Sequence, residues 1–207
     1  MNILCVCTSH RGPQTDTRQC IDNLACAGIP TIMNVGCADI ALGRNMDITR
    51  GLQRANVDGT EVIVLFDDDM VFSVEQVEKI AAHALEAPCP VSGIYVMKNR
   101  ELAIWRIEES DRFVAGLGFI AASVKVLNEK AKELPTFRWK DTEATLWTKA
   151  GPDEGIWGQE DIYFCKQFGG VEIAPIIVGH LKTIPMAPSR DAVERILGEL
   201  DTEEVIR

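Results

Sequence analysis

Apolar runs separated by amphipathic segments mark the first 87 residues of the chain. Short runs that are typical of buried parallel strands lie at 2–8, 31–35 and 61–67. Helical periodicity predicts a helix after each of them, over about 16–27, 41–56 and 74–85. Strands that alternate with helices predict an α/β fold, in which helices pack on the faces of a mostly parallel sheet.

Local signals at helix ends support two of these helices. Gly28 is a natural stop for the first, whose apolar face is expected to consist of Cys20, Ile21, Leu24 and Ala25. Ser73 followed by Gln76 forms a capping box at the start of the third helix. Its apolar stripe is expected to comprise Val74, Val77, Ile80, Ala81, Ala84 and Leu85.

The second half has a different pattern, which predicts a mixed or antiparallel arrangement. Strand-like pieces lie at 91–97, 101–107, 112–118, 119–123, 171–175 and 176–180. Helices are predicted over 124–134 and within 159–170, and a long loop over 135–158, a region rich in Trp, Gly, Pro and charge.

We expect a single catalytic domain over 1–188, with a first half up to residue 87 and a second half from 88. The tail, 189–207, is expected to form an amphipathic helix with Val193, Ile196, Leu197 and Leu200 on one face. This helix would pack on the domain or on a second subunit of a homodimer.

Composition narrows the classes of partner. The chain of 207 residues has a formal net charge of −10, which argues against nucleic acid because phosphate binding needs clustered Lys and Arg. No apolar run approaches the ~18 residues of a membrane span, and the N-terminus lacks the features of a signal peptide. Seven cysteines without a CxxC pair predict buried free thiols in a cytoplasmic protein.

An acidic cluster stands out in the stretch VIVLFDDDMVF. Asp67, Asp68 and Asp69 follow directly on the third predicted strand, and adjacent carboxylates repel unless a cation or a basic side chain compensates them. Ligands bind beyond the carboxyl ends of strands in open α/β sheets. Carboxylates at such a place suit Mg²⁺ or Mn²⁺, with water and substrate phosphate completing the shell. The alternative is a solvated acidic turn that caps the next helix.

Two further motifs follow in the second half. Glu160 and Asp161 open a predicted helix in WGQEDIYFC, where the helix dipole alone would favour carboxylates. His180 follows a predicted strand in VGHLK, and its imidazole could join a metal shell that contains the aspartates or could simply be structural.

This ordered set of motifs resembles the GT-A glycosyltransferases, in particular small bacterial and phage members. GRNMDITRGL before the acidic cluster and AGLGFIAAS after it look like further counterparts, so the resemblance extends from about residue 3 to 186. It implies a GT-A fold, a Mn²⁺ or Mg²⁺ cofactor, a UDP- or GDP-sugar donor and a glycan or other hydroxyl acceptor.

The resemblance also implies roles for individual residues. Metal ligands would be Asp67, Asp69 and His180, with Asp69 the most direct. The nucleotide-sugar would contact Thr8, His10, Arg11, Arg44, Asn45, Asp68 and Gly118. Asp161, or less favourably Glu160, would be the catalytic base of an inverting transfer, and Trp157 with Gly158 would contact the acceptor sugar. The first loop, TSHRGP, departs from the family pattern, and retaining members also carry an acidic residue near this position.

Other classes of protein are compatible with parts of the pattern. VLFDDDMVF also resembles the opening motif of haloacid-dehalogenase-type phosphatases, with Asp67 as nucleophile and Asp69 as acid/base, but Met70 and Val71 stand where that family has Gly-Thr. A non-catalytic nucleotide-sugar or metal-binding module of the same fold would not need Asp161. The missing Gly and Glu of the loop argue against calcium binding of the EF-hand type.

Overall fold

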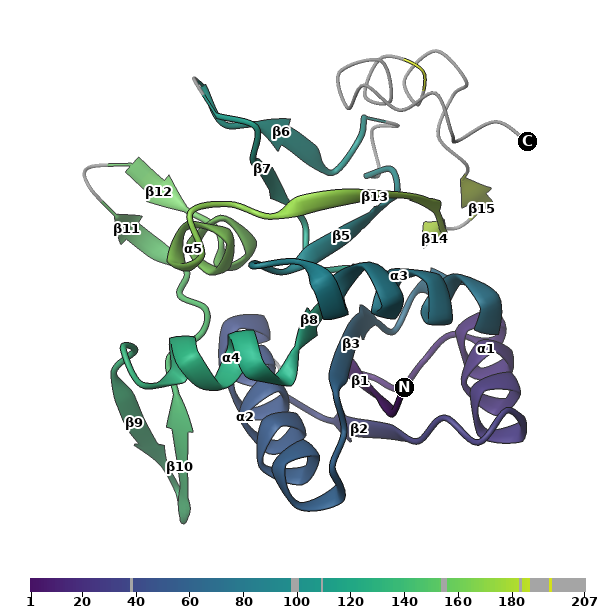
Figure 1. Ribbon diagram of the computed structural model, residues 1–207, viewed down its shortest axis with the longest axis horizontal. Coiled ribbons are helices and arrows are strands. Elements are labelled where there is room, and N and C mark those ends of the chain that lie inside the picture. Colours follow the sequence, from purple (N-terminus) through teal and green to yellow (C-terminus); the bar gives the residue numbers. More distant parts are fainter. Residues whose placement is uncertain are drawn as a thin grey trace.

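A six-stranded sheet forms the centre of the protein, in the order β13-β5-β8-β3-β1-β2 (Figure 1). The structure, a computed structural model, describes residues 1–37, 39–97, 101–108, 110–153, 156–182, 184–186 and 194. The strands of this sheet are β1 (Ile3–Ser9), β2 (Thr31–Val35), β3 (Val62–Asp67), β5 (Val91–Ile94), β8 (Phe119–Ser123) and β13 (Glu172–Ile177). The helices are α1 (Thr15–Cys26), α2 (Ile40–Asp58), α3 (Val74–Glu86), α4 (Val124–Ala131) and α5 (Glu160–Gln167).

The first half of the sheet is parallel, as the sequence predicts. β1 pairs in parallel with both β2 and β3, so their carboxyl ends meet at one edge. β8 is antiparallel to its neighbours β3 and β5, while β13 and β5 are parallel. The predicted mixed arrangement of the second half is therefore confirmed, and the chain is a mixed α/β protein.

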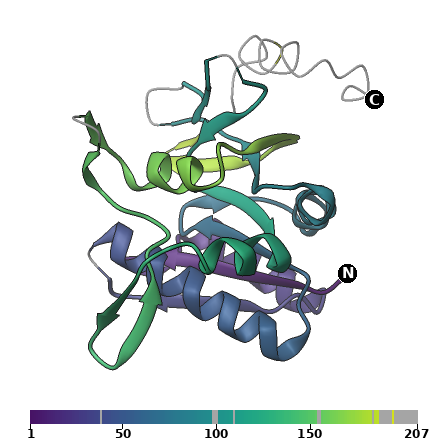
Figure 2. The same ribbon diagram turned by 60° about the vertical axis from the view of Figure 1, so that its left-hand side comes forward.

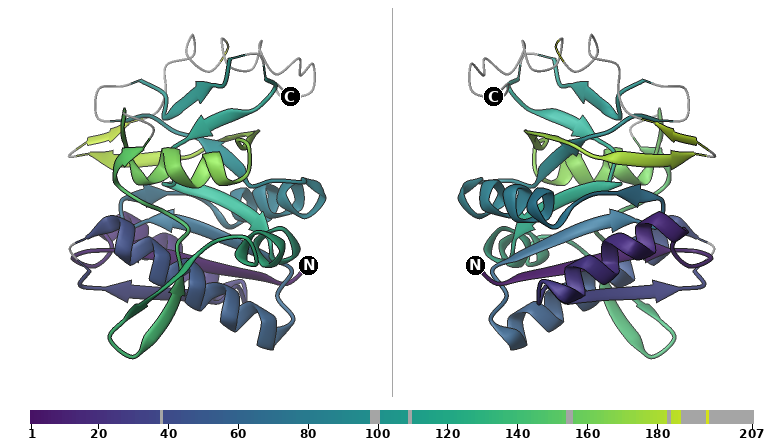
Figure 3. Two further views of the ribbon diagram at one scale, coloured as in Figure 1. Left: turned by 90° about the vertical axis from the view of Figure 1, so that its left-hand side faces the viewer. Right: turned by 90° about the vertical axis from the view of Figure 1, so that its right-hand side faces the viewer.

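Helices cover both faces of the sheet (Figures 2 and 3). Alternate residues of β1 point to opposite sides, because Leu4 and Val6 belong to one buried cluster and Cys5 and Cys7 to the other. The first cluster contains side chains of α2, α4 and α5, and the second contains side chains of α1 and α3. Strands buried on both faces explain why the first half shows apolar runs rather than alternation.

The signals predicted at helix ends are present, and Gly28 follows α1 with a φ of 77°. On the expected apolar face of α1, Cys20 and Leu24 are buried, but Ala25 is exposed. Ser73 accepts from the backbone N–H of Gln76 at the start of α3, and the Gln76 side chain accepts from Ser73 N, so both halves of the capping box are present. Val77, Ile80, Ala81 and Ala84 are buried as expected, but Leu85 at the edge of the stripe is 39% exposed. α4 ends at Ala131, shortly before the predicted 134.

The prediction of a long loop over 135–158 is wrong. β9 (Thr136–Trp139) and β10 (Thr142–Thr145) form one antiparallel hairpin, and β11 (Gly151–Asp153) pairs with β12 (Ile156–Gly158). The predicted strands at 171–175 and 176–180 are also divided differently, because β13 runs on to Ile177 and β14 (Gly179–Lys182) begins after Val178. The remaining short strands are β4 (Met70–Val71), β6 (Ile104–Arg106), β7 (Phe113–Ala115) and β15 (Ile184–Met186).

The segment between the two hairpins is held to α2 by hydrogen bonds from one helix face. Thr49 Oγ1 accepts from Thr145 N and from the indole of Trp147, which is fully buried. The amide of Asn45 bonds both the N–H and the carbonyl of Thr148, whose hydroxyl donates to Ala41 O. Positions 41, 45 and 49 lie four residues apart, so α2 offers one continuous face to this segment.

The cysteines agree with the expected free thiols. All seven are free, and those at 5, 7, 20, 89 and 165 are buried. Burial raises the pKa of Cys89 to about 11 and that of Cys165 to about 12, which keeps both thiols protonated at neutral pH. Within the ranges given above, no helix is both long and apolar enough to cross a membrane. Apart from Glu194, the predicted tail helix lies outside the described residues.

Candidate functional site

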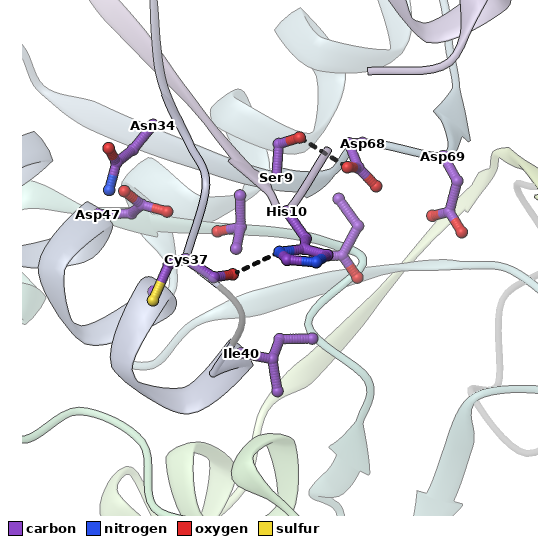
Figure 4. A pocket seen from close by; sticks show the side chains of 11 residues that line it. Ser9, His10, Asn34, Cys37, Ile40, Asp47, Asp68 and Asp69 are labelled. Atoms are coloured by element: carbon purple, nitrogen blue, oxygen red, sulfur yellow. Dashed lines mark hydrogen bonds between the residues drawn. The ribbon is translucent and has the colours of Figure 1, made fainter. Parts of the chain in front are cut away.

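A cavity of about 310 Å³ opens where the carboxyl ends of β1, β2 and β3 meet the start of α2 (Figure 4). It is the place where open α/β sheets bind their ligands. Its walls are formed by Thr8, Ser9, His10, Asn34, Cys37, Ile40, Gly43, Asp47, Asp67, Asp68 and Asp69. The sequence predicted Thr8, His10 and the three aspartates among these.

Asp67 is neutralised by a buried arginine from α2. Arg44 Nη2 donates to both carboxylate oxygens of Asp67 at 2.9 Å, and Arg44 Nη1 donates to Glu160 Oε1 at 2.8 Å. The Arg44 side chain is 6% exposed, whereas Asp67 and Glu160 are 25% and 16% exposed, so the guanidinium end of both ion pairs is shielded from water. The two carboxylates hold the pKa of Arg44 above its usual range, against the effect of burial. Arg44 thereby joins the acidic cluster to the Glu160–Asp161 motif.

Asp68 is tied to the loop after β1. Ser9 Oγ donates to Asp68 Oδ2 at 2.6 Å and accepts from Gly12 N at 2.8 Å, as Figure 4 shows for the first of these bonds. Gly12 has a φ of 94°, which favours glycine over residues with a side chain. Burial raises the pKa of Asp68, while the Ser9 bond lowers it. Ser9 was missed by the sequence interpretation, because a single serine at the end of a strand has no distinctive pattern.

Asp69 lies beside His180. β4 pairs with β14 so that His180 stands opposite Met70, and His180 Nε2 lies 3.2 Å from Asp69 Oδ2. His180 Nδ1 lies 2.6 Å from Val96 O, and because a carbonyl only accepts, Nδ1 carries a proton. A neutral imidazole would then direct its Nε2 lone pair at a carboxylate. A proton on Nε2, or a cation bound by both groups, removes this repulsion.

This pair fits a divalent cation in its chemistry. Mg²⁺ and Mn²⁺ accept carboxylate oxygen, and Mn²⁺ also accepts imidazole, with waters and substrate phosphate as the remaining ligands. Among the described residues no group of three His, Cys, Asp or Glu side chains is close enough to hold an ion. Asp67, which the resemblance includes in the metal shell, bonds Arg44 through both of its oxygens. Asp69 and His180 are therefore the residues that could hold the ion, together with a phosphate-bearing ligand.

Gly118 contacts the site through its backbone. Its carbonyl accepts from Asp67 N at 3.1 Å, and its N–H donates to the hydroxyl of Tyr95 at 2.8 Å. A Cβ on Gly118 would lie 2.8 Å from the Tyr95 ring, and a Cβ on Gly116 would collide with the Tyr95 hydroxyl. Packing against Tyr95 thus explains the small residues of AGLG.

Tyr95 itself lies at the centre of the motifs. Its ring packs edge-on against His180 with centroids 5.5 Å apart. Burial, followed by the charge of Asp67, raises the pKa of its phenol well above the usual range. Asp161 contributes to the same shift, so Tyr95 lies within electrostatic range of both acidic motifs.

Asp161 opens α5 as predicted and is half-buried. Its pKa is raised by burial and by the negative charge of Glu160, while the N–H of Ile162 lowers it by donating to Oδ1 at 2.8 Å. Arg44 opposes the shift more weakly. A carboxylate whose pKa lies above its ordinary value is a better proton acceptor near neutral pH.

Some predicted residues lie elsewhere. Asn45 uses its amide on the backbone of Thr148 and does not line the cavity. Arg11 is exposed beside the cavity rather than part of its wall. Trp157 and Gly158 belong to β12, and the side chain of Trp157 lies outside what the structure describes.

Comparison with known proteins supports the fold alone. No protein-family model and no curated protein matches the chain. Protein A197 from STIV has a similar structure, with a TM-score of 0.64 and 17% identity over 92% of each chain.

Two further structures are less similar. A 4-diphosphocytidyl-2C-methyl-D-erythritol synthase from Anaerococcus prevotii has a TM-score of 0.45 and 10% identity over 97% of this chain and 98% of its own. A glycosyltransferase involved in the glycosylation of the major capsid of PBCV-1 has a TM-score of 0.35 and 15% identity over 61% of this chain and 62% of its own. TM-scores below 0.5 do not establish a shared fold, so the function is inferred from the site.

Proposed function

We propose that the protein is a metal-dependent glycosyltransferase of GT-A type, which moves a sugar from a UDP- or GDP-sugar to an acceptor hydroxyl. The observation that carries this proposal is the convergence of separate motifs at one edge of the sheet. Arg44 bonds Asp67 and Glu160, Asp69 contacts His180, and Asp67 bonds Gly118. These residues come from across the chain and match the motifs on which the family resemblance rests.

The donor's diphosphate would lie at the acidic end of the cavity. Asp69 and His180 would hold Mn²⁺ or Mg²⁺, and the ion would offset the negative charge that the leaving diphosphate gains. Asp67 would join this shell only where its pair with Arg44 opens. Ser9 keeps Asp68 directed at the β1 loop, so Asp68 shapes the cavity wall.

Asp161 would act as the base of an inverting transfer. An acceptor hydroxyl is a poor nucleophile, and a half-buried carboxylate can remove its proton as the bond to the sugar forms. The raised pKa of Asp161 suits this role. Glu160 suits it less, because its carboxylate accepts from Arg44.

The alternative functions are less well supported. A haloacid-dehalogenase-type nucleophile needs an unhindered carboxylate oxygen, whereas both oxygens of Asp67 accept from Arg44. A non-catalytic nucleotide-sugar module has no use for a half-buried Asp161 with a raised pKa.

A panel of nucleotide-sugars with Mn²⁺, followed by thermal shift and by donor hydrolysis, tests the proposal. A ligand at a hundredfold excess over its Kd stabilises the protein by about 2.7 kcal/mol. We expect one class of donor to give this shift only with Mn²⁺, and Asp69→Ala to abolish it. Asp22→Ala, which removes an exposed carboxylate of α1, is the matched control. No metal-dependent shift with any donor, or an unchanged shift in Asp69→Ala, would contradict the proposal.

A further inference from the structure

A buried carboxylate lies at the end of the cavity opposite the proposed diphosphate site. Asp47 of α2 lines the cavity, is 1% exposed, and has its Oδ1 buried without a hydrogen-bond partner among the described residues. Figure 4 shows Asp47 beside Asn34, with the His10 ring between this pair and Asp68 with Asp69. The cavity therefore has two polar ends, and the family resemblance gives no role to Asp47 and Asn34 at this end.

The position of Asp47 follows from the close approach of α2 to β1. Gly51, four residues on, faces β1 so closely that a Cβ would lie 2.9 Å from Val6 Cγ2. Gly43, four residues before, packs near Cys37 and Thr8. A carboxylate between these two glycines is forced against the strand end, where an oxygen such as Oδ1 that is buried without a hydrogen bond is costly. A ligand that donates hydrogen bonds would offset this cost.

We propose that Asp47 and Asn34 recognise the base of the nucleotide donor and select guanine. This inference rests on the proposed function and specifies its donor as a guanine nucleotide. It also assigns a specificity role to Asp47, which lies within GRNMDITRGL but has no role in the family resemblance.

The choice of guanine follows from the hydrogen-bond donors and acceptors that each base presents. Guanine presents two adjacent donors, N1–H and the 2-amino group, and an ionised carboxylate presents two acceptors. Guanine O6 lies beside N1–H and can accept from an amide such as that of Asn34, which stands opposite Thr8 in the β1–β2 register. Uracil presents acceptor, donor and acceptor, so one carboxylate oxygen would face a uracil carbonyl. Ionised Asp47 therefore favours guanine over uracil.

Selectivity for guanine requires Asp47 to be ionised. Burial raises its pKa to about 6, while Thr8 and Asn34, and the charges of Arg50 and Arg44, lower it. Cys7 of β1 also faces it, with a thiol pKa raised mainly by burial. At pH 8 the group is ionised and offers two acceptors. At pH 5 it is mainly neutral and offers one donor and one acceptor, which no longer match guanine.

The walls of the cavity suit the faces of a flat ring. His10 Nδ1 lies 3.2 Å from Cys37 O, which holds the imidazole across the cavity. Ile40 lines the same cavity and is 47% exposed. A base bound between these side chains would cover the exposed surface of Ile40.

Calorimetry with GDP, UDP and xanthosine diphosphate in Mn²⁺ at pH 8 tests the inference. We expect the wild type to prefer GDP over UDP by roughly 5- to 150-fold, the discrimination of one bidentate pair. Asp47→Asn changes two acceptors into one acceptor and one donor. It should therefore lose the preference for GDP and bind xanthosine diphosphate more tightly, because xanthine has a carbonyl in place of the 2-amino group. Asp47→Ala should lose the preference without gaining a new one.

The controls separate this inference from the proposed function. Asp58→Asn at the other end of α2 removes the same charge and should keep the wild-type preference. Lowering the pH to 5 should reduce the GDP preference of the wild type but leave that of Asp47→Asn unchanged. A wild type that binds diphosphates with no preference for GDP, or an Asp47→Asn variant that keeps it, overturns the role of Asp47 and leaves the transferase proposal standing. A wild type that binds none of the diphosphates overturns both.

Discussion

Arg44 donates from one nitrogen to both carboxylate oxygens of Asp67 at 2.9 Å, in a setting where the arginine side chain is 6% exposed. A buried guanidinium of this kind compensates charges that would otherwise repel each other. It also links α2 to β3 and, through Glu160, to α5.

Loss of this arginine should be strongly destabilising. Arg44→Met leaves Asp67 and Glu160 without their cation, and removal of one partner from a buried ion pair costs about 3–5 kcal/mol. Arg54→Met on the same helix removes a solvent-exposed pair with Asp58 and should cost less than about 1 kcal/mol. Urea denaturation of both variants measures the difference. Equal losses would show that the Arg44 pairs contribute no more than surface pairs.

Substitution of Asp161 should separate chemistry from donor binding. Asp161→Asn is expected to lower turnover by roughly 10²–10⁴, because it removes a general base, and to leave donor affinity within a few-fold. Since the base acts when ionised and its pKa is raised, wild-type turnover should fall with decreasing pH at values above the ordinary ~3.9 of an aspartate. This fall of turnover at low pH should be absent in Asp161→Asn.

Two outcomes would change the assignment of Asp161. Unchanged turnover in Asp161→Asn, measured with an accepted sugar acceptor, would remove it from the mechanism. A product that keeps the anomeric configuration of the donor would reject the inverting transfer and leave Asp161 as an acceptor-binding residue.

Asp47 should make the protein less stable as the pH rises. Its folded pKa of about 6 exceeds the unfolded value of 3.8, so the folded state binds more protons between these values and stability falls through this window. The full penalty, on the order of 3 kcal/mol, is present at pH 8 and absent below pH ~4. Asp47→Asn should therefore be more stable than the wild type at pH 8 and equally stable at pH 4, by chemical denaturation. A variant that is less stable at pH 8 would show that the carboxylate has compensating partners.

The glycines around Tyr95 should respond differently to removal of its hydroxyl. An added Cβ at Gly116 meets the Tyr95 hydroxyl first, whereas one at Gly118 lies 2.8 Å from the ring carbon itself. Each alanine should cost about 1–3 kcal/mol in the wild type through overpacking. In a Tyr95→Phe background the cost of Gly116→Ala should shrink and that of Gly118→Ala should persist. Double-mutant cycles measure this, and equal coupling at both glycines would contradict the packing described.

The sequence predicts the first half of the fold well and parts of the second half poorly. β1 and β3 are buried on both faces, so both strands can be predicted from their apolar runs alone. The hairpin of β9 and β10 consists largely of exposed or half-buried polar residues. Thr145 N at the end of this hairpin donates to Thr49 Oγ1 of α2, and contacts between distant segments leave no local pattern.

The candidate site was likewise predictable from the sequence only in part. Aspartates after a strand are visible as a motif, and the basic side chain that the motif requires is Arg44, which bonds Asp67. Asp47 resembles any polar residue in a helix until α2 is placed against β1. Glycines four residues before and after it were the available signal, because such spacing allows a helix to approach a strand closely.

The position of β8 has a consequence for the growing chain. β8 lies between β3 and β5 in the sheet, although it follows both of them in the sequence. During synthesis the apolar strand β3 therefore has one unpaired edge until residues 119–123 have been made. At typical elongation rates this takes roughly 3–11 s after Asp67. An unpaired apolar edge is a template for association with other chains. The nascent chain is therefore open to such association along β3 between the emergence of Asp67 and that of Ser123.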